Sequence, residues 1–282
     1  MSAVTTGSPT VRRRRLAAAL RRLRDQSGMT ADEAARAIGI SKSSLSRIEN
    51  GLVSVLPPVA RSLLELYGVE SPDIEPLLQV AREARQRGWW QAYDDVLPDW
   101  FNVYVGLEAE AAEIRDFQPQ LVYGLLQTAD YARAILRSGL PDAPDEDIER
   151  RVELRMRRKE NDRPPRLWLV LDEAVLHRPV GGAEVMRVQL KKILDASNVP
   201  GNNIQVLPFS AGEHASIGEQ FSIMTFPEPT DPGIVYIETH AGSLYLEGQH
   251  VRTYAAVFQQ LMASALGKRE SAAMISAAMS AL

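Results

Sequence analysis

The segment MTADEAARAIGISKSSLSRIENG, Met29–Gly51, decides the fold of the N-terminal part of this chain. Thr30 followed three positions later by Glu33 has the spacing of a capping box, so a short helix is expected to start there. Gly39 supplies the left-handed residue that ends such a helix. Ser41 is placed to cap a second helix that runs to the end of the segment. Two short helices joined by a tight connection are therefore predicted.

The second of these helices has an unusually narrow apolar side. On a helix of 3.6 residues per turn, Leu45 and Ile48 share one side. The helix therefore depends on its neighbours for stability and offers a wide polar face that suits the major groove of DNA, where Arg pairs with guanine and small side chains permit close approach. The alternative is a merely solvated amphipathic helix. The opposite arc consists of Lys42, Ser43, Ser46, Arg47 and Asn50.

Helical signals continue on both sides of this segment. Apolar residues at helical spacing predict a helix over residues 13–26 before it. After it, Pro57 and Pro58 suit the first turn of a helix that Gly68 ends, and a fifth helix is expected over residues 73–87. Residues 1–11 lack periodicity and are expected to be a disordered tail. The N-terminal part is thus predicted to be an all-α head of five short helices.

Charge is distributed unevenly along the 282 residues. Residues 1–69 contain 11 Lys or Arg and 5 Asp or Glu, whereas the remainder contains 21 and 31. A basic head on an acidic body is typical of a nucleic-acid-binding domain joined to a soluble partner domain. The alternative is that the run Arg12–Arg15 is a solvated arm that skews the count, although the head stays basic without it. The absence of cysteine excludes disulfides and thiolate sites.

No run approaches the ~20 apolar residues that span a bilayer, and no apolar run follows the N-terminal arginines. A cytoplasmic protein without membrane contact is expected.

Composition changes beyond Gly88. An aromatic-rich stretch over residues 88–111 is expected to join the two domains. Base stacking on its rings is the alternative, which the surrounding acidic residues disfavour. Residues 107–115 resemble a helix, and five strand candidates follow: RLWLVLD, NIQVLPF, EQFSIMTF, GIVYIET and SLYLEG. The predicted second domain is mixed α/β (α+β), with about five strands and helices over one or both faces.

The segment quoted first resembles the helix-turn-helix of the lambda-repressor-like (XRE) family of transcription regulators. The resemblance implies that the second helix enters the major groove and that Arg24 and Glu49 form an ion pair between the first and third helices. The alternative for that pair is an exposed contact of little energetic value. The family commonly has Gln where this chain has Ala31, which puts one positioning contact in doubt. By position, the resemblance and the basic run give the DNA-binding candidates Lys42, Ser43, Ser44, Ser46, Arg47, Asn50, Thr30, Arg12 and Arg13.

The C-terminal part resembles another family. The strings YVGLEAEAAEIRDFQPQLVYGLLQTADYARAIL, LDEAVLHRPVGGAEVMRVQLKKIL and IQVLPFSAGEHASIGEQFSIMTF look like the C-terminal domain of the WhiJ-like, antitoxin-like regulators of actinobacteria. That resemblance implies a small partner protein encoded nearby and a regulatory output, without a known ligand or reaction.

Catalytic motifs are absent from the C-terminal sequence. It lacks His-Glu-x-x-His, a phosphate-binding glycine loop and the G-x-S-x-G elbow. We therefore expect no enzyme and no cofactor or metal, and regard a small-molecule effector pocket as a more credible alternative. The segment FSAGEHASIGEQF, residues 209–221, is the candidate loop near such a pocket or a partner surface, the alternative being an ordinary surface loop. The scattered metal-ligand candidates are Glu173, His177, His214, Glu219, Glu238, His240 and His250.

These observations predict a sequence-specific transcription regulator that acts as a homodimer on a palindromic operator in double-stranded DNA, in the cytoplasm and associated with the nucleoid. The expected organisation is a tail (1–11), a helix-turn-helix domain (12–70), a connecting helix (71–88) and a domain for dimerisation and partner or effector binding (89–282). The terminal SAAMISAAMSAL is a candidate dimer seam, with packing inside one chain as the alternative. The alternative function is an antitoxin that neutralises a partner and autoregulates its operon.

Overall fold

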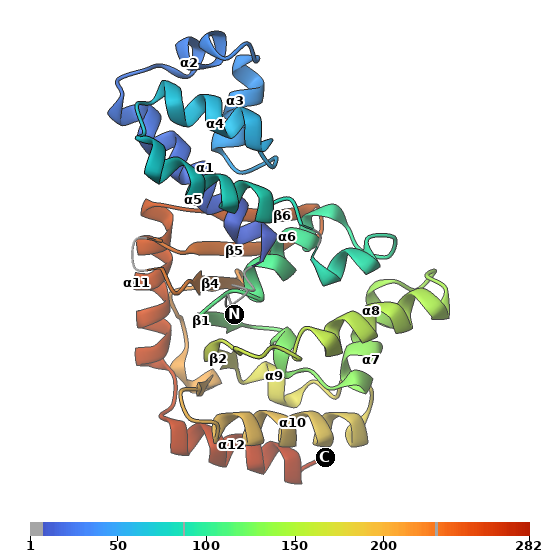
Figure 1. The fold of residues 1–282 in the computed structure, drawn as a ribbon. Helices are drawn as coiled ribbons and strands as arrows, with labels where there is room; N and C mark the ends of the chain where they lie inside the picture. The colour runs from blue at the N-terminus through green and yellow to red at the C-terminus, as the bar shows by residue number, and fades with distance from the viewer. Residues whose placement is uncertain (1–7, 87, 229–230) are drawn as a thin grey trace. The chain divides into compact units, whose positions relative to one another are not determined.

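Two separately packed units, Met1–Gln91 and Ala92–Leu282, make up the chain. The computed structural model describes residues 8–86, 88–228 and 231–282. The first unit is helical and the second is built on one mixed sheet (Figure 1). The predicted fold class, a helical head followed by a mixed α/β domain, is confirmed.

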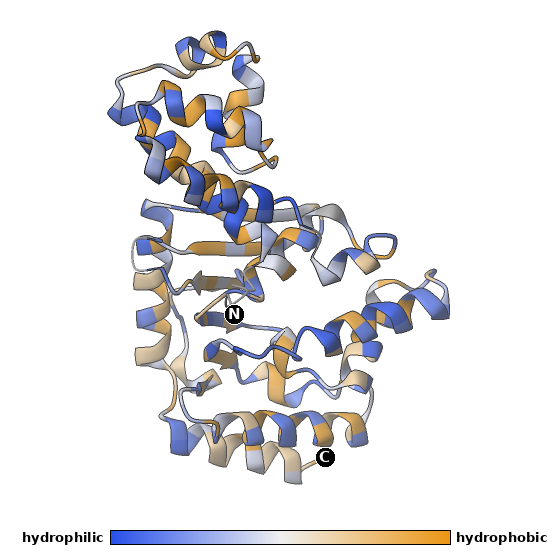
Figure 2. Cartoon of the chain, in the orientation of Figure 1, coloured by the Kyte–Doolittle hydropathy of each residue, from blue (hydrophilic) through white to orange (hydrophobic). Residues whose placement is uncertain are grey.

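The N-terminal unit packs its helices around one apolar cluster. Each helix carries both hydrophobic and hydrophilic residues, as orange and blue alternate along its turns (Figure 2). Leu20, Leu45, Leu63 and Leu64 are each 0% exposed at the centre of the cluster. The helices are α1 (Pro9–Gln26), α2 (Ala31–Ala37), α3 (Lys42–Glu49), α4 (Pro57–Leu66) and α5 (Ser71–Glu83).

The first helix begins earlier than the sequence predicted. Pro9 occupies its first turn, and the Ser8 hydroxyl accepts a hydrogen bond from the backbone N–H of Thr10 at 3.2 Å. Proline suits this position because its missing N–H would have no intrahelical partner, and serine is a favoured cap. The expectation of a disordered tail is therefore wrong for residues 8–11, while residues 1–7 lie outside the described part. The fifth helix ends at Glu83, before the predicted residue 87.

One six-stranded sheet forms the centre of the C-terminal unit, in the order β3-β2-β1-β4-β5-β6. Strand β1 pairs in parallel with β2, and β2 with β3, whereas β4, β5 and β6 continue the sheet antiparallel. The register places Asp116 of β1 opposite Ser222 of β4, and Ser222 opposite Tyr236 of β5. The strands are β1 (Glu113–Gln118), β2 (Arg166–Asp172), β3 (Asn203–Leu207), β4 (Phe221–Thr225), β5 (Ile234–Thr239) and β6 (Gly242–Leu246).

Strand β1 is the one the sequence did not predict, because residues 107–115 were expected to be helical. The helix α6 (Asp99–Glu108) ends before this strand starts. Only Ile114 and Phe117 are apolar in EIRDFQ, so the segment lacks the apolar content of a central strand. Besides these two, the strand buries Asp116, which is 0% exposed and accepts a hydrogen bond from the Ser222 hydroxyl. Cross-strand pairing, rather than local pattern, makes this segment a strand.

Helix α11 (Gln249–Ser264) covers one face of the sheet, where Phe258 packs with Phe117 and Phe221 (Figure 1). Helix α12 (Lys268–Ser280) packs on α10 (Ala183–Ser197) and β3, and buries Ser271, Ile275 and Ala278 on one side of the terminal segment. Burial there matches the alternative of intrachain packing for SAAMISAAMSAL.

The opposite face of the sheet carries a row of polar side chains from three neighbouring strands. Because side chains alternate along a strand, Asp116, Ser222 and Tyr236 point away from the α11 cluster. Tyr104 of α6 packs on Tyr236 with ring centroids 4.4 Å apart, and Phe101 stacks on Tyr104 at 5.3 Å. The remaining helices are α7 (Ala129–Gly139), α8 (Asp145–Arg157), α9 (Ala174–His177) and the 3-10 turns η1 (Trp89–Tyr93), η2 (Gly124–Leu126) and η3 (Phe209–Ala211).

Candidate nucleic-acid interface

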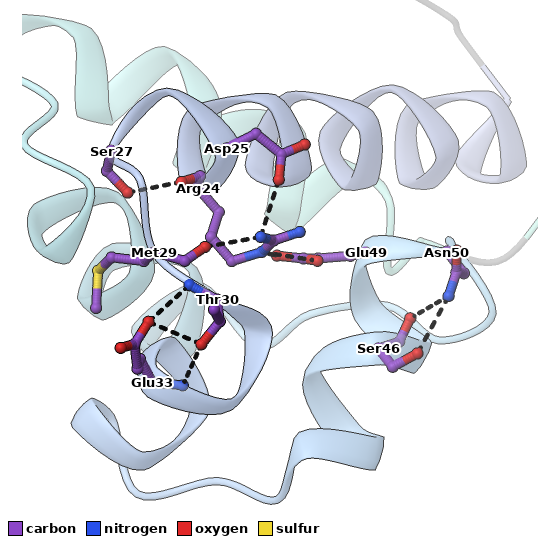
Figure 3. A network of polar contacts seen from close by, with 9 residues as sticks. All are labelled: Arg24, Asp25, Ser27, Met29, Thr30, Glu33, Ser46, Glu49 and Asn50. Atoms are coloured by element: carbon purple, nitrogen blue, oxygen red, sulfur yellow. Dashed lines mark hydrogen bonds and ion pairs between the residues drawn. The ribbon is translucent and has the colours of Figure 1, made fainter.

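Helices α2 and α3 form the core of the interface, and local hydrogen bonds fix where each one starts. The Thr30 hydroxyl accepts from the backbone N–H of Glu33 at 3.3 Å, and the Glu33 carboxylate accepts from the Thr30 N–H at 2.9 Å (Figure 3). Gly39, with φ 73°, lets the chain turn after α2. The Ser41 hydroxyl then accepts from the Ser44 N–H at 3.1 Å and caps α3. The sequence predicted each of these features, and only residues 38–41 separate the two helices.

A buried ion pair fixes α3 against α1. Arg24 Nε lies 2.9 Å from Glu49 Oε1 and 3.2 Å from Oε2, and the two side chains are 12% and 6% exposed (Figure 3). Arg24 Nη1 also donates to the carbonyl of Met29 at 2.8 Å, which ties the connection between α1 and α2 to the same guanidinium. The hydrogen bond that Arg24 donates to the Glu49 carboxylate raises the pKa of Arg24 above its ordinary value. The pair is therefore not the exposed contact that was the alternative.

The outer face of α3 is polar, as its sequence predicted. Leu45 and Ile48 are 0% and 9% exposed and face the apolar cluster. The side chains of Lys42 and Arg47 make no hydrogen bond or ion pair with any residue that the structure describes. Two cations on one exposed helical face, both without an internal partner, are available to an anionic surface such as a DNA backbone. The exposed residues of this helix and its C-cap are Lys42, Ser43, Ser44, Ser46, Arg47 and Asn50.

Several predicted contact residues already have internal partners. The Asn50 amide donates to the carbonyl and the hydroxyl of Ser46 at 2.8 and 3.2 Å (Figure 3). The hydroxyls of Ser43 and Ser44 lie 2.9 and 2.8 Å from that of Ser41. Thr30 Oγ1 serves the capping box, so its first role is to start α2. These groups are exposed and remain DNA-contact candidates, but each would share or exchange a hydrogen bond on binding.

The basic run is part of α1 and does not form a separate arm. Arg12 Nε lies 3.1 Å from Glu83 Oε2 of α5, so this guanidinium is engaged within the N-terminal unit. Arg13 follows it in the same helix. The alternative that Arg12–Arg15 is a solvated arm is therefore wrong, because Ser8 and Pro9 start the helix before these residues. Contact of Arg12 and Arg13 with DNA stays a prediction.

The metal-ligand candidates of the C-terminal unit are not brought together. His177 pairs with Glu173 at 3.4 Å, Glu219 accepts from Tyr254, and Glu238 accepts from Tyr236. Glu238 belongs to β5, whereas His240 lies past its end, so the two do not share a strand face. Within residues 8–86, 88–228 and 231–282, no three His, Asp or Glu side chains are grouped to hold a metal ion.

The arrangement of α2, the short connection and α3 defines the N-terminal unit as a helix-turn-helix domain, and a family model described as a helix-turn-helix domain matches residues 15–77. A second model, described as a domain of unknown function (DUF5753), matches residues 101–277, which is more than half of the chain. The chain belongs to this DUF5753 family. No significant match was found among curated proteins or among solved structures. None of the described helices combines the length and the apolar character that crossing a membrane requires.

Proposed function

We propose that the protein is a sequence-specific transcription regulator that reads the major groove of double-stranded DNA with α3. The observation that carries the proposal is the exposed face of α3, on which Lys42 and Arg47 have no internal partner among the described residues. The buried pair of Arg24 and Glu49 supports it, because a recognition helix must be held rigidly to read bases.

The two cations are assigned different roles. Arg47 would pair bidentately with a guanine, which supplies sequence preference. Lys42, in the first turn of α3, would contact a phosphate, which positions the helix without reading sequence. Ser43 and Ser46 are small enough to let the helix backbone approach the bases closely. Binding would therefore weaken steeply with salt while its sequence preference persists.

The regulator would act as a homodimer on an inverted repeat, with two recognition helices about 34 Å apart. Dimerisation and binding of a small partner protein are assigned to residues 92–282 on the strength of the family resemblance. A partner that binds one of two conformational states more tightly would shift the protein toward that state. If the two states differ in affinity for the operator, the partner would thereby change operator binding.

Selection from a random DNA pool with the purified full-length protein, at two salt concentrations, tests this function. We expect an enriched inverted repeat that is lost when Arg47 is replaced by Ala. Enrichment of no motif at either salt concentration would contradict sequence-specific binding by this chain alone. Sedimentation of the protein with the selected DNA then gives the number of chains per site.

A further inference from the structure

A cavity of about 290 Å³ lies inside the C-terminal unit. It is lined from the sheet by Ser222 of β4 and Tyr236 of β5, and from the helices by Tyr104 of α6, Leu136 of α7 and Arg155 of α8. Its volume is at the low end of the ~300–1,000 Å³ of small-molecule sites. Gln220, at the end of the segment 209–221, also lines it, so that segment does border a cavity.

Two arginines of the cavity wall, Arg158 and Arg155, differ in whether a carboxylate is hydrogen-bonded to them. Arg158 uses its Nε and Nη2 edge to hold the carboxylate of Glu108, with both nitrogen–oxygen distances 2.7 Å. Glu108 also accepts from the hydroxyls of Tyr104 and Tyr123, at 2.9 and 3.0 Å. The positive charge of Arg158 is therefore neutralised inside the protein.

Arg155 has no such carboxylate. Its Nη1 donates to Gln127 Oε1 at 2.7 Å, and among the described residues no partner is found for Nε or Nη2. Glu238 is close enough to attract it electrostatically but forms no ion pair with it, and accepts from Tyr236 instead. Burial, followed by the charge of Arg158, lowers the pKa of Arg155 to about 10, so the group is still a cation at neutral pH. Arg155 is half-buried, so its cation is only partly hydrated and an anion that pairs with it would be favoured.

Charges of both signs surround Arg155, because Glu238 also lines the cavity and Lys159 lies close by. Lys159 donates to the backbone carbonyl of Gln127, the residue that also holds Arg155. Its pKa is lowered to about 8, first by burial and then by Lys192, Arg158 and Arg155. An anion placed at Arg155 would be attracted by Arg155 and Lys159 and repelled by the carboxylate of Glu238.

Apolar and aromatic side chains share the rest of the wall with polar ones, among them Gln118, Gln220 and Glu238. Phe101, Leu121, Ile135, Leu136 and Leu140 line it together with the rings of Tyr104 and Tyr236. An apolar body would therefore be buried favourably beside the cation.

We propose that this cavity binds a small monocarboxylate with an apolar body, whose carboxylate pairs with the Nε and Nη2 edge of Arg155. The pairing repeats the one that Glu108 makes with Arg158 in the same wall. Two free nitrogens match two carboxylate oxygens, whereas a phosphate would keep further oxygens without donors. The binding does not depend on the DNA-binding function, so each is tested separately.

Nuclear magnetic resonance of the full-length protein with arginine side chains labelled by nitrogen-15 tests the site. The probes are acetate and 3-phenylpropanoate, with 3-phenylpropanamide as the neutral isostere and phenyl phosphate as the other anion. We expect both carboxylates to shift the Arg155 Nε signal and leave that of Arg157 unchanged, with 3-phenylpropanoate binding at least ten-fold more tightly than acetate or the amide. Arg157 is the matched control because it is exposed on the same helix.

Variants complete the test by calorimetry with 3-phenylpropanoate. Arg155→Met is expected to weaken binding at least ten-fold and Arg157→Met less than two-fold. Arg155→Lys keeps the charge and loses the two-donor edge, so its affinity for 3-phenylpropanoate is expected to lie between those of the two Met variants. It also distinguishes loss of the contact from misfolding of Arg155→Met. No shift of the Arg155 signal with either carboxylate, or equal binding by Arg155→Met, would overturn the proposal. Tighter binding of phenyl phosphate would overturn the assignment to a carboxylate.

Discussion

Arg24 of α1 and Glu49 of α3 form a nearly buried ion pair, with Arg24 Nε 2.9 Å from Glu49 Oε1. The same guanidinium donates to the carbonyl of Met29, in the connection between α1 and α2. One side chain therefore sets the position of the recognition helix relative to α1 and to the preceding turn. This arrangement links the stability of the N-terminal unit to its ability to present Arg47.

Replacing Arg24 with Met should lower the free energy of unfolding of the N-terminal unit by about 2–4 kcal/mol, because it leaves the Glu49 carboxylate buried without a partner. Hydrogen exchange of the α3 amides in the full-length protein measures this loss. Arg61→Met is the control, since Arg61 and Glu75 pair at 3.2 Å with side chains 47% and 58% exposed. That change should cost less than about 1 kcal/mol. Equal losses in the two variants would contradict a special role for the Arg24 pair.

Arg47→Ala and Lys42→Ala should weaken DNA binding in different ways. Loss of a bidentate contact to guanine costs about 1–3 kcal/mol and relaxes preference at one base pair, whereas loss of a phosphate contact weakens all sequences alike and reduces the salt slope by about 1. Binding titrations on the selected operator and on single-base variants, over a range of salt, separate the two. Lys191→Ala, on α10 and 69% exposed, should change neither quantity. A uniform loss from Arg47→Ala would assign Arg47 to the phosphate backbone.

Glu108→Gln should destabilise the C-terminal unit by roughly 3–5 kcal/mol, because it leaves Arg158 as a buried cation without its counter-ion. The side chains of Arg158 and Glu108 are 4% and 3% exposed. Urea unfolding followed by circular dichroism measures the change. Glu149→Gln removes an exposed carboxylate, 53% accessible, from its pair with Arg133 and should cost under about 1 kcal/mol. A loss from Glu108→Gln no larger than that of the control would show that the pair adds nothing to stability.

Asp116 should make the stability of the C-terminal unit depend on pH. Burial raises its pKa to about 7, against an ordinary value of 3.8. The folded state then holds the proton more tightly than the unfolded state, so this contribution is full below about pH 4 and is lost as the pH rises through about 7. Asp116→Asn removes that dependence, so the free energy of unfolding of the variant should rise relative to that of the native protein as the pH rises. The expected change is a few kcal/mol, at about 1.4 kcal/mol per pKa unit.

Urea unfolding at several pH values between 4 and 8 measures the difference. Asp195→Asn is the control, because Asp195 is 59% exposed in α10. It should follow the native protein at every pH. A constant difference between the native protein and Asp116→Asn would show that Asp116 does not titrate in this range.

Local signals in the sequence were sufficient for the N-terminal unit. The pair of Thr30 and Glu33, the glycine at position 39 and the cap at Ser41 act within four residues of the helix ends they define. They predicted α2 and α3 correctly. The error at the start of α1 arose from the same kind of signal, since Ser8 and Pro9 form a cap and a first turn that were read as part of a tail.

Local signals were insufficient for β1. Its sequence is mostly charged or polar, and it becomes a central strand through pairing with β2, about 50 residues later, and with β4, about 110 residues later. Asp116 is accommodated there because Ser222 lies directly opposite it. A pattern of hydrophobicity within the strand could not reveal that partner.

The sequence by itself determined the helical head, the two-residue apolar stripe of α3 and the polar arc opposite it, because helix caps and periodicity depend on neighbouring residues. In the C-terminal unit, tertiary structure alone decided which charges are paired. Arg158 meets Glu108, 50 residues away in sequence, whereas Arg155, one turn earlier on the same helix, meets no carboxylate within hydrogen-bonding distance among the described residues. The two arginines look equivalent in the sequence, and only the packing of distant elements pairs one with a carboxylate and leaves the other without one in the part of the chain that the structure describes.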